Sequence, residues 1–352
     1  MKTYYIMGTA GSGKTAFCLA LALELQEMGL KVGYFKPVGW PPRRQGLDDD
    51  AYLFRQMLEL PYEHDELVPV VTNPFYLTKY GLNRSLVDRV VKAFGVVSED
   101  RDVVIVEGTS SPRTMAALGL DGPSMADRLD AVPILVQKTD DDFAFDQVIL
   151  YADHMRQRGR PFLGMVFNNI TRPMMHKVQD MYCHILDERG EVCLGVIPSQ
   201  REIASPTARE FWDLLGGELL AGEENLDQLV EGTLVGAMSI DSALSYMRRQ
   251  PNKALITGGD RGDLVMAAME TSTTLVILTG GIYPSLNVIS RAEDKGVPLL
   301  LVPEDTYSAV EKLHAISRKI RPTDQTAIEM ARKMFDQHCD RQAIMAPLSD
   351  LL

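Results

Sequence analysis

A glycine-rich segment near the start of the chain has the residue types and spacing of a phosphate-binding loop. Residues 8–15 read GTAGSGKT and fit the P-loop (Walker A) pattern G-x-x-x-x-G-K-[ST] at every position. Glycines let backbone N–H groups turn towards an anion without Cβ clashes. Lys14 would then reach the β- and γ-phosphates, and Thr15 would ligate Mg²⁺. The predicted nucleotide-binding residues are Gly8, Thr9, Ala10, Gly11, Ser12, Gly13, Lys14, Thr15 and Ala16.

The segments on either side of this loop have the patterns that such a loop requires. The apolar run Thr3–Met7 predicts a strand before the loop, and Ala16–Met28 predicts a helix after it. The positive end of that helix would face the same phosphates. The alternative interpretation is a glycine turn that matches the pattern by chance. Such a turn would need neither the strand before it nor the helix after it.

Charged residues at the ends of two other predicted strands could complete the site. Glu107 follows the apolar run Val103–Val106 at the strand edge where α/β folds bind ligands. We therefore expect Glu107 on Mg²⁺, directly or through water, and a carboxylate that only caps the strand is the alternative. Lys36 follows the predicted strand Lys31–Phe35, and its spacing alone assigns it no role.

Two charged segments after the second predicted strand allow two interpretations each. The acidic run Asp48-Asp49-Asp50 precedes the helical stretch Ala51–Leu60, where acidic residues also stabilise a first turn. The basic pair Arg43–Arg44 beside Trp40 could meet an anionic substrate or form a solvated surface loop.

The hydrophobic pattern predicts an α/β fold with a parallel sheet and helices on both faces. Short β-branched runs alternate with helical patterns, and the strands are apolar throughout. The strand candidates of the first part are Thr3–Met7, Lys31–Phe35, Val103–Val106, Pro133–Val136, Gly164–Phe167 and Gly195–Ile197. The helix candidates between them include Ala16–Met28, Leu86–Phe94, Phe145–Arg158 and Met174–Arg189.

A second, smaller α/β domain is predicted after a Gly- and Glu-rich segment, GGELLAGEEN at 216–225. Its strand candidates are Lys253–Thr257, Thr274–Thr279 and Pro298–Val302, and its helix candidates are Gly262–Glu270, Leu286–Lys295 and Tyr307–Lys319. A last helix, Thr323–His338, is expected to cap this domain. The predicted organisation is a P-loop domain at 1–213, a linker at 214–230 and the second domain at 231–352.

The composition is that of an ordinary globular protein, with 45% hydrophobic and 24% charged residues. A formal net charge of −12 argues against nucleic acid or an anionic membrane as a partner. No apolar stretch is long enough to span a bilayer, and the start lacks a signal-peptide pattern. The four scattered cysteines are expected to be free thiols in a reducing cytosol, and the histidines form no metal-like pair. We therefore expect a cytoplasmic protein.

Together the motifs resemble the dethiobiotin synthetase family of P-loop ligases over about residues 1–205. The resemblance rests on GTAGSGKT, GYFKPVG, the acidic run ending at Asp50-Ala51, VVIVEG, GMVFNN and LGVIP, in that order. It implies ATP and Mg²⁺ as cofactors, with Lys14 and Thr15 on phosphates and metal and Lys36 near the transferred phosphoryl group. It also implies Asp50 and Glu107 on Mg²⁺ and Asn168 on the adenine ring, where an Asn amide can both donate and accept.

This resemblance does not extend to an acceptor. The family's loop usually reads GTxTxxGKT, one residue longer than the loop found here, and GTSSP at 108–112 replaces its glycine-rich stretch. Both segments line the acceptor site in the family. The resemblance therefore implies a nucleotide site and names no acceptor.

The second domain resembles a DRTGG domain through LVGAMS at 234–239, ALITGGDRGDLVMAAME at 254–270 and LVILTGGIYPS at 275–285. A synthetase-like P-loop module coupled to a DRTGG domain is similar to the N-terminal part of long phosphotransacetylases, where an acyl-transferring domain follows. Because the sequence ends at Leu352, we expect no transacetylase activity from it alone. The segment Gly258–Arg261 could bind a nucleotide or another small anionic effector. Glycines that only permit tight turns, or line a subunit interface, are the alternative.

Three functions are consistent with these patterns. The first is a regulatory or sensory ATPase that hydrolyses ATP slowly, with Lys14, Lys36 and Mg²⁺ stabilising the developing charge. The second is an ATP-dependent ligase that activates a small carboxylate or carbamate, with Lys36 and Ser110 or Ser111 positioning the acceptor. The third is a non-catalytic interaction module. Exposed strand-end loops of parallel sheets often pair across a two-fold axis, so we also expect a homodimer.

Overall fold

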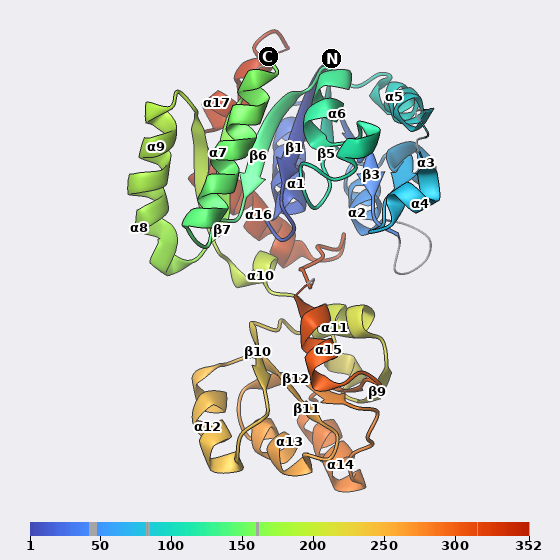
Figure 1. The fold of residues 1–352 in the computed structure, drawn as a ribbon, viewed down its shortest axis with the longest axis vertical. Coiled ribbons are helices and arrows are strands. Elements are labelled where there is room, and N and C mark those ends of the chain that lie inside the picture. The colour runs from blue at the N-terminus through green and yellow to red at the C-terminus, as the bar shows by residue number, and fades with distance from the viewer. Residues whose placement is uncertain (42–47, 82, 84, 160–161, 315, 352) are drawn as a thin grey trace. The chain divides into compact units, whose positions relative to one another are not determined.

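The computed structural model describes residues 1–41, 48–81, 83, 85–159, 162–314 and 316–351. The chain divides into two compact units (Figure 1). The first unit combines Met1–Ile203 with Ile320–Leu352, and the second is Ala204–Lys319. The basic pair Arg43–Arg44 lies outside the described residues.

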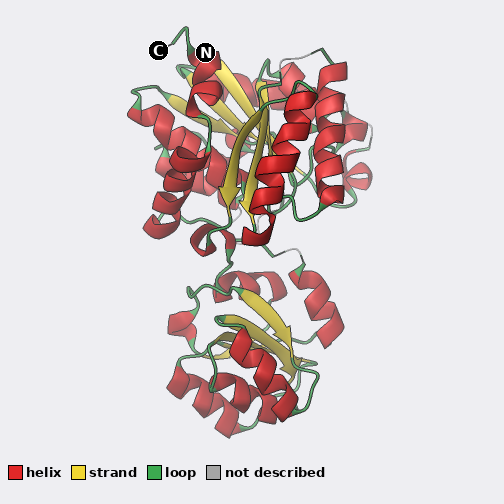
Figure 2. Ribbon diagram, turned by 90° about the vertical axis from the view of Figure 1, so that its left-hand side faces the viewer, coloured by secondary structure: helices red, strands yellow, loops and turns green. Residues whose placement is uncertain are grey.

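The first unit is built on a six-stranded parallel sheet with the strand order β2-β5-β1-β6-β7-β8. These strands are β1 (Lys2–Gly8), β2 (Val32–Phe35), β5 (Val103–Glu107), β6 (Val132–Gln137), β7 (Gly164–Ile170) and β8 (Cys193–Pro198). Two short strands, β3 (Val38–Gly39) and β4 (Val70–Val71), pair separately. The predicted parallel sheet is confirmed, and helices cover both of its faces (Figure 2).

Helices connect successive strands of the first unit, and further helices follow its last strand in the chain. They are α1 (Lys14–Glu27), α2 (Asp49–Met57), α3 (His64–Leu67), α4 (Tyr76–Tyr80), α5 (Ser85–Ser98), α6 (Gly122–Arg128), α7 (Asp142–Gln157), α8 (Met175–Lys177), α9 (Cys183–Glu188), α10 (Arg201–Ala204), α16 (Gln325–His338) and α17 (Arg341–Met345). A π-helical turn, Val178–Tyr182, joins α8 to α9. In the part of the chain that the structure describes, none of the helices is long and apolar enough to span a membrane.

The C-terminal helices belong to the first unit, so the expectation that the helix at 323–338 caps the second domain is wrong. Helix α16 packs along α1 (Figure 1), where the rings of Phe17 and Phe335 meet edge-on with centroids 5.4 Å apart. At the rim of this contact, Arg332 of α16 pairs with Glu27 of α1. The apolar side of α16 is thus buried by residues roughly three hundred positions away, a contact that its local pattern does not specify.

The second unit has a five-stranded sheet with the order β10-β11-β12-β13-β9. Its strands are β9 (Glu218–Ala221), β10 (Gly232–Val235), β11 (Lys253–Gly258), β12 (Thr273–Thr279) and β13 (Leu299–Leu301). All neighbours are parallel except β9, which pairs antiparallel with β13. The predicted linker at 214–230 is therefore wrong, because it contains an edge strand of this sheet.

Helices cover both faces of the second sheet, and the predicted second α/β domain is confirmed. They are α11 (Ala208–Leu215), α12 (Ile240–Arg249), α13 (Gly262–Met269), α14 (Leu286–Lys295) and α15 (Thr306–Leu313). Helices α12, α13 and α14 share one apolar cluster with the sheet, and α11 and α15 share another on the opposite face.

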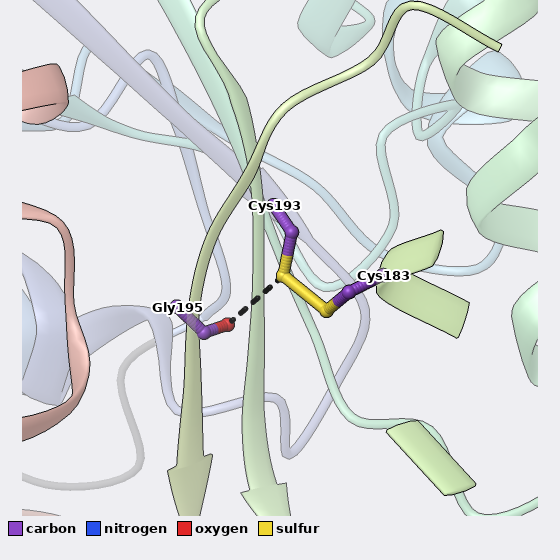
Figure 3. Close-up of a disulfide and its surroundings, with 3 residues drawn as sticks. All are labelled: Cys183, Cys193 and Gly195. Carbon is purple, nitrogen blue, oxygen red and sulfur yellow. Dashed lines mark hydrogen bonds between the residues drawn. A yellow bond between two sulfur atoms is a disulfide. The ribbon is translucent and has the colours of Figure 1, made fainter. Parts of the chain in front are cut away.

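Two of the four cysteines are paired, which corrects the expectation of four free thiols. Cys183 at the start of α9 forms a disulfide with Cys193 of β8 (Figure 3), with 5.6 Å between their Cα atoms. Cys18 is free and buried, and Cys339 is free and half-buried. The two cysteines meet because β8 returns beside α9. Their separation of ten residues in the sequence does not by itself predict a disulfide or exclude one.

The contact between α1 and α16 predicts a large contribution of Phe335 to stability. The Phe335 side chain is 2% exposed, so Phe335→Ala should leave a cavity and lower the free energy of unfolding by about 3–5 kcal/mol. Chemical denaturation of the full chain measures this loss. Phe143, at the start of α7, is 79% exposed, and Phe143→Ala should change stability by less than about 0.5 kcal/mol. Equal losses in the two variants would contradict the packing of α16 described above.

Lys253 predicts a pH dependence of stability in the second unit. Its buried ammonium at the start of β11 donates to the Thr271 hydroxyl and the Ser272 carbonyl, both at 2.9 Å. Burial lowers the pKa of Lys253 from its ordinary 10.5 to about 8, so the fold disfavours the charged form. The unfolded chain binds this proton more tightly, and stability should therefore rise as pH increases from about 8 towards 10.5.

Denaturation of the native protein and of Lys253→Met at about pH 7 and about pH 10 measures this effect. We expect the stability of the native protein relative to Lys253→Met to be greater at about pH 10 than at about pH 7. The exposed Lys92 of α5 is the control, because Lys92→Met should differ from the native protein by the same amount at both pH values. If the difference in stability between the native protein and Lys253→Met were the same at both pH values, the lowered pKa of Lys253 would be ruled out.

Candidate functional site

The phosphate-binding loop connects β1 to α1 and is supported from β7. Gly13 is the N-cap of α1, with φ 77° and ψ 25° in the left-handed region. Asn168 of β7 donates from Nδ2 to the carbonyl oxygen of Ser12 at 2.8 Å. A Cβ atom at Gly13 would lie 2.3 Å from that Nδ2 atom. Glycine is therefore needed at this position for two reasons, its backbone angles and the close approach of Asn168.

Strand alternation puts three polar side chains on the sheet face that α1 covers. Tyr34 of β2 lies in register with Ile105 of β5, and Glu107 follows two residues further along the same strand. Since every second residue of a strand faces the same side, Tyr34 and Glu107 lie on one face, and Lys36 continues that alternation just after β2. The sheet thereby directs these groups towards the N-terminal end of α1.

Glu107 joins the start of α1 to two strands. Its Oε1 atom accepts a hydrogen bond from the Thr15 hydroxyl at 2.7 Å, and its Oε2 atom accepts one from the Tyr34 hydroxyl at 2.9 Å. The Tyr34 ring stacks on Phe54 of α2, with centroids 3.8 Å apart. Because Glu107 is only 2% exposed, both oxygens need such partners.

A buried ion-pair cluster lies beside Glu107. The Lys36 ammonium donates to both oxygens of Asp48, at 2.9 and 3.0 Å, and to Oδ2 of Asp50 at 2.5 Å. The other oxygen of Asp50 lies 3.3 Å from the Thr15 hydroxyl oxygen. Helix α2 brings both acids to this place, because Asp48 is its N-cap and accepts from the backbone N–H groups of Asp50 and Ala51.

Burial and the surrounding charges shift the pKa values of these groups. Burial, followed by the proximity of Asp50, raises the pKa of Glu107 to about 7, although Lys36 and Lys14 act in the opposite direction. Burial would lower the pKa of Lys36, but Asp50 and Asp48 outweigh it and the pKa lies above its usual range. For Lys14 burial prevails, and the pKa is lowered. Acids outnumber lysines in this cluster, so a divalent cation would lower its electrostatic energy.

The donor set fits Mg²⁺ and phosphate groups. Thr15, Asp50 and Glu107 offer hydroxyl and carboxylate oxygens, the hard ligands that Mg²⁺ prefers. The described residues include no group of three His, Cys, Asp or Glu side chains that could hold a metal ion by themselves. Phosphate oxygens and water would have to complete the coordination, which is usual for Mg²⁺. The Lys14 ammonium donates to the Thr9 carbonyl at 2.7 Å and so lies across the loop itself.

The structure brings most of the predicted site residues together. Thr15, Asp50 and Glu107 meet at the N-terminal end of α1, with Lys36 directly beside Asp50. Asn168 lies against the loop and bonds to Ser12, so its role on an adenine ring stays a prediction. The roles of the others in binding also stay predictions.

Sequence reasoning missed two members of this cluster. It assigned no role to Tyr34, although this residue lies two positions before Lys36 and must share its sheet face if the strand continues. It also assigned Asp48 no role beyond helix capping. The N-cap of a helix and the residue two positions later lie close together in space. An Asp two residues before another Asp at a helix start therefore indicates that both can point into one site.

Two protein-family models match the chain. Residues 2–207 match a family model described as an AAA domain, and residues 210–316 match one described as a DRTGG domain. The first match covers more than half of the chain. The chain belongs to this AAA domain family. The order predicted from the motifs, a dethiobiotin synthetase-like P-loop domain followed by a DRTGG domain, is thereby confirmed.

The AAA and DRTGG domains together are similar to one half of several phosphate acetyltransferases. The chain is 25% identical over 357 residues to the phosphate acetyltransferase of Nitratidesulfovibrio vulgaris, covering 96% of this chain and 50% of that protein. It is also 25% identical over 362 residues to the one of Nitrosomonas europaea, covering 98% and 51%. The chain thus spans about half the length of the curated relatives it matches.

Solved structures give weaker similarities. The CBS and DRTGG domains of the regulatory region of Clostridium perfringens pyrophosphatase, in complex with the activator diadenosine tetraphosphate, match at 15% identity and a TM-score of 0.27. That match covers 45% of this chain and 82% of that one. The cell division protein FtsY of Thermotoga maritima matches at 17% identity and a TM-score of 0.31, covering 56% and 62%.

The close contact between Gly13 and Asn168 predicts the effect of an alanine in the loop. Gly11 and Gly13 both have positive φ, 68° and 77°, so alanine at either position should cost about 1–2 kcal/mol of backbone strain. A Cβ at Gly11 would meet nothing within 4 Å, whereas at Gly13 it would displace Asn168 from Ser12. Gly13→Ala should therefore lower stability by about 1–3 kcal/mol more than Gly11→Ala.

Denaturation of the two variants measures this difference. In an Asn168→Ala background, which removes the clash and the hydrogen bond together, the two alanine substitutions should cost the same. A difference that persists in that background would show that the contact with Asn168 is not its cause.

Proposed function

We propose that the AAA domain of this chain binds ATP with Mg²⁺ and that the chain works as a regulatory or sensory module. The observation that carries the proposal is the meeting of Thr15, Asp50 and Glu107 at the N-terminal end of α1, next to a complete phosphate-binding loop. The backbone N–H groups of the loop would bind phosphate oxygens, and the positive end of α1 would strengthen that binding. Thr15 and the two carboxylates would hold the metal ion.

Slow ATP hydrolysis is the activity that these residues support best. Bound Mg²⁺ would neutralise negative charge on the phosphoryl group. Lys14 would move from the Thr9 carbonyl to the phosphates, and Lys36 would stabilise the same charge from its buried position. We expect turnover to be slow, because Asp48 and Asp50 already bind the Lys36 ammonium.

The relatives suggest what such a module would regulate. Because the chain is similar to half of each phosphate acetyltransferase, we propose that its nucleotide state influences acetyl transfer by another domain or by a partner protein. In the DRTGG domain, the glycine-rich turn Gly258–Arg261 at the start of α13 would receive a nucleotide or another small anionic effector. Two copies of the chain would associate as a homodimer.

Nucleotide binding is tested by isothermal titration calorimetry and thermal unfolding of the full chain with ATP and Mg²⁺. ATP·Mg²⁺ at one hundred times its dissociation constant should stabilise the protein by about 2.7 kcal/mol and raise its melting temperature. ATP should bind more tightly than GTP if Asn168 contacts the base. ADP release that requires a particular small carboxylic acid would favour the ligase alternative instead.

Lys14→Ala is the loss-of-function variant, and it should reduce ATP affinity at least about tenfold because it removes the ammonium that contacts the phosphates. Lys92→Ala is its control, since Lys92 is an exposed residue of α5. A native protein with no nucleotide-dependent change in melting temperature would refute the proposal, and unchanged ATP affinity in Lys14→Ala would favour an interaction module with a vestigial loop.

A further inference from the structure

Lys36 lies between two carboxylates in the buried part of the site, and only one of them is a candidate metal ligand. Its side chain is 7% exposed, and those of Asp48 and Asp50 are 5% and 11% exposed. All three charged groups are therefore shielded from bulk water. A buried ammonium that loses an anionic partner needs another one close by, because an unpaired buried charge costs several kcal/mol.

The two oxygens of Asp50 have different neighbours. Oδ1 faces the Thr15 hydroxyl at 3.3 Å, and Oδ2 accepts from Lys36 at 2.5 Å. Mg²⁺ held by Thr15 and Oδ1 of Asp50 would therefore bind a carboxylate whose other oxygen holds Lys36. Lys36 and a divalent cation repel each other, so close approach of the metal to Asp50 weakens the contact between Asp50 and Lys36.

Asp48 has the geometry to keep Lys36 in place when this contact weakens. Both of its oxygens accept from the Lys36 ammonium, at 2.9 and 3.0 Å, so the pair survives when Asp50 turns away. Its Oδ1 atom also accepts from the backbone N–H groups of Asp50 and Ala51, which fixes the Asp48 carboxylate as the N-cap of α2. The anchor is thus part of the same helix turn that carries the metal ligand.

We propose that Asp48 is a positioning residue that retains Lys36 when Asp50 exchanges its contact with Lys36 for Mg²⁺. The inference rests on the proposed Mg²⁺·ATP function and goes beyond it, because it assigns to Asp48 the control of whether Asp50 is available to the metal. Without the Asp48 charge, Lys36 has Asp50 as its strongest remaining partner in this cluster, and the metal must break that pair. The predicted consequence is a loss of the gain in ATP affinity that Mg²⁺ provides.

The test is the ratio of ATP dissociation constants in EDTA and in Mg²⁺, measured by calorimetry on the full chain. Asp48→Asn is the variant of choice, because Asn caps a helix as well as Asp and has the same shape, so α2 is preserved. The native protein should bind ATP more tightly in Mg²⁺ than in EDTA. In Asp48→Asn we expect this ratio to fall about tenfold, with the EDTA value within about threefold of the native one or tighter.

A rescue distinguishes this role from a structural one. Lys36→Met combined with Asp48→Asn removes the competitor for Asp50, so the Mg²⁺-dependent gain should return towards the native ratio. A helix damaged by the loss of its cap would not recover in this way. Asp324→Asn is the matched control, because Asp324 is the N-cap of α16 and its side chain accepts from the Ala327 N–H. That variant should keep the native ratio.

The outcomes separate the two proposals. Native protein that binds no ATP in either buffer would refute the proposed function. Native protein that gains affinity with Mg²⁺, together with an Asp48→Asn variant that gains as much, would overturn only the role of Asp48. If Asp48→Asn does not fold, Asp48→Ser replaces it, because Ser also caps a helix and carries no charge. The inference requires the Mg²⁺-dependent gain to fall in this variant too, and a native ratio would overturn it.

Discussion

The hydrogen bonds that Thr15 and Tyr34 donate to Glu107 are the interaction on which the rest of the site depends. One carboxylate accepts from the first turn of α1 and from the edge strand β2, while its own backbone lies in β5. Leaving either buried oxygen without a donor would cost about 1–3 kcal/mol. The loop, β5 and β2 must therefore reach their places together, and the stacking of Tyr34 on Phe54 extends this requirement to α2. The geometry of the candidate site is consequently a property of the whole sheet edge and not of the loop alone.

Burial of charge explains why the cluster around Glu107 has its particular composition. Isolated buried ions are costly, so Lys36 lies between Asp48 and Asp50, and burial raises the pKa of Glu107. An apolar cluster of the same volume would be cheaper to fold. Its retention as a set of ionisable groups is consistent with binding a ligand whose charge offsets the excess of acids, which is what a metal–phosphate complex provides.

Sequence reasoning predicted the parts of this site that local pattern specifies. The loop and Glu107 each lie where an apolar strand ends, and the carboxyl ends of parallel strands meet at one sheet edge. Lys36 also follows a strand, but its role was implied only by a family resemblance. Asp50 came from a resemblance, and its local context alone allowed a capping role. Tyr34 was missed because an aromatic residue inside a buried strand is usually part of the hydrophobic core. Only the fold shows that its hydroxyl lies beside Glu107. The disulfide of Cys183 and the packing of α16 on α1 were missed for the same reason, since both depend on segments brought together only by the fold.

The return of the chain to the first unit has a consequence for how the two units are linked. The second unit, Ala204–Lys319, is inserted into the first, because α16 and α17 follow it in sequence and pack on the first unit. Two covalent connections, at residues 203–204 and 319–320, therefore join the units, where a linear arrangement of domains would have one. Arg341 of α17 pairs with Glu24 of α1, and α1 begins at the phosphate-binding loop. The helix that would meet the phosphates is thus also the helix against which the returning chain folds.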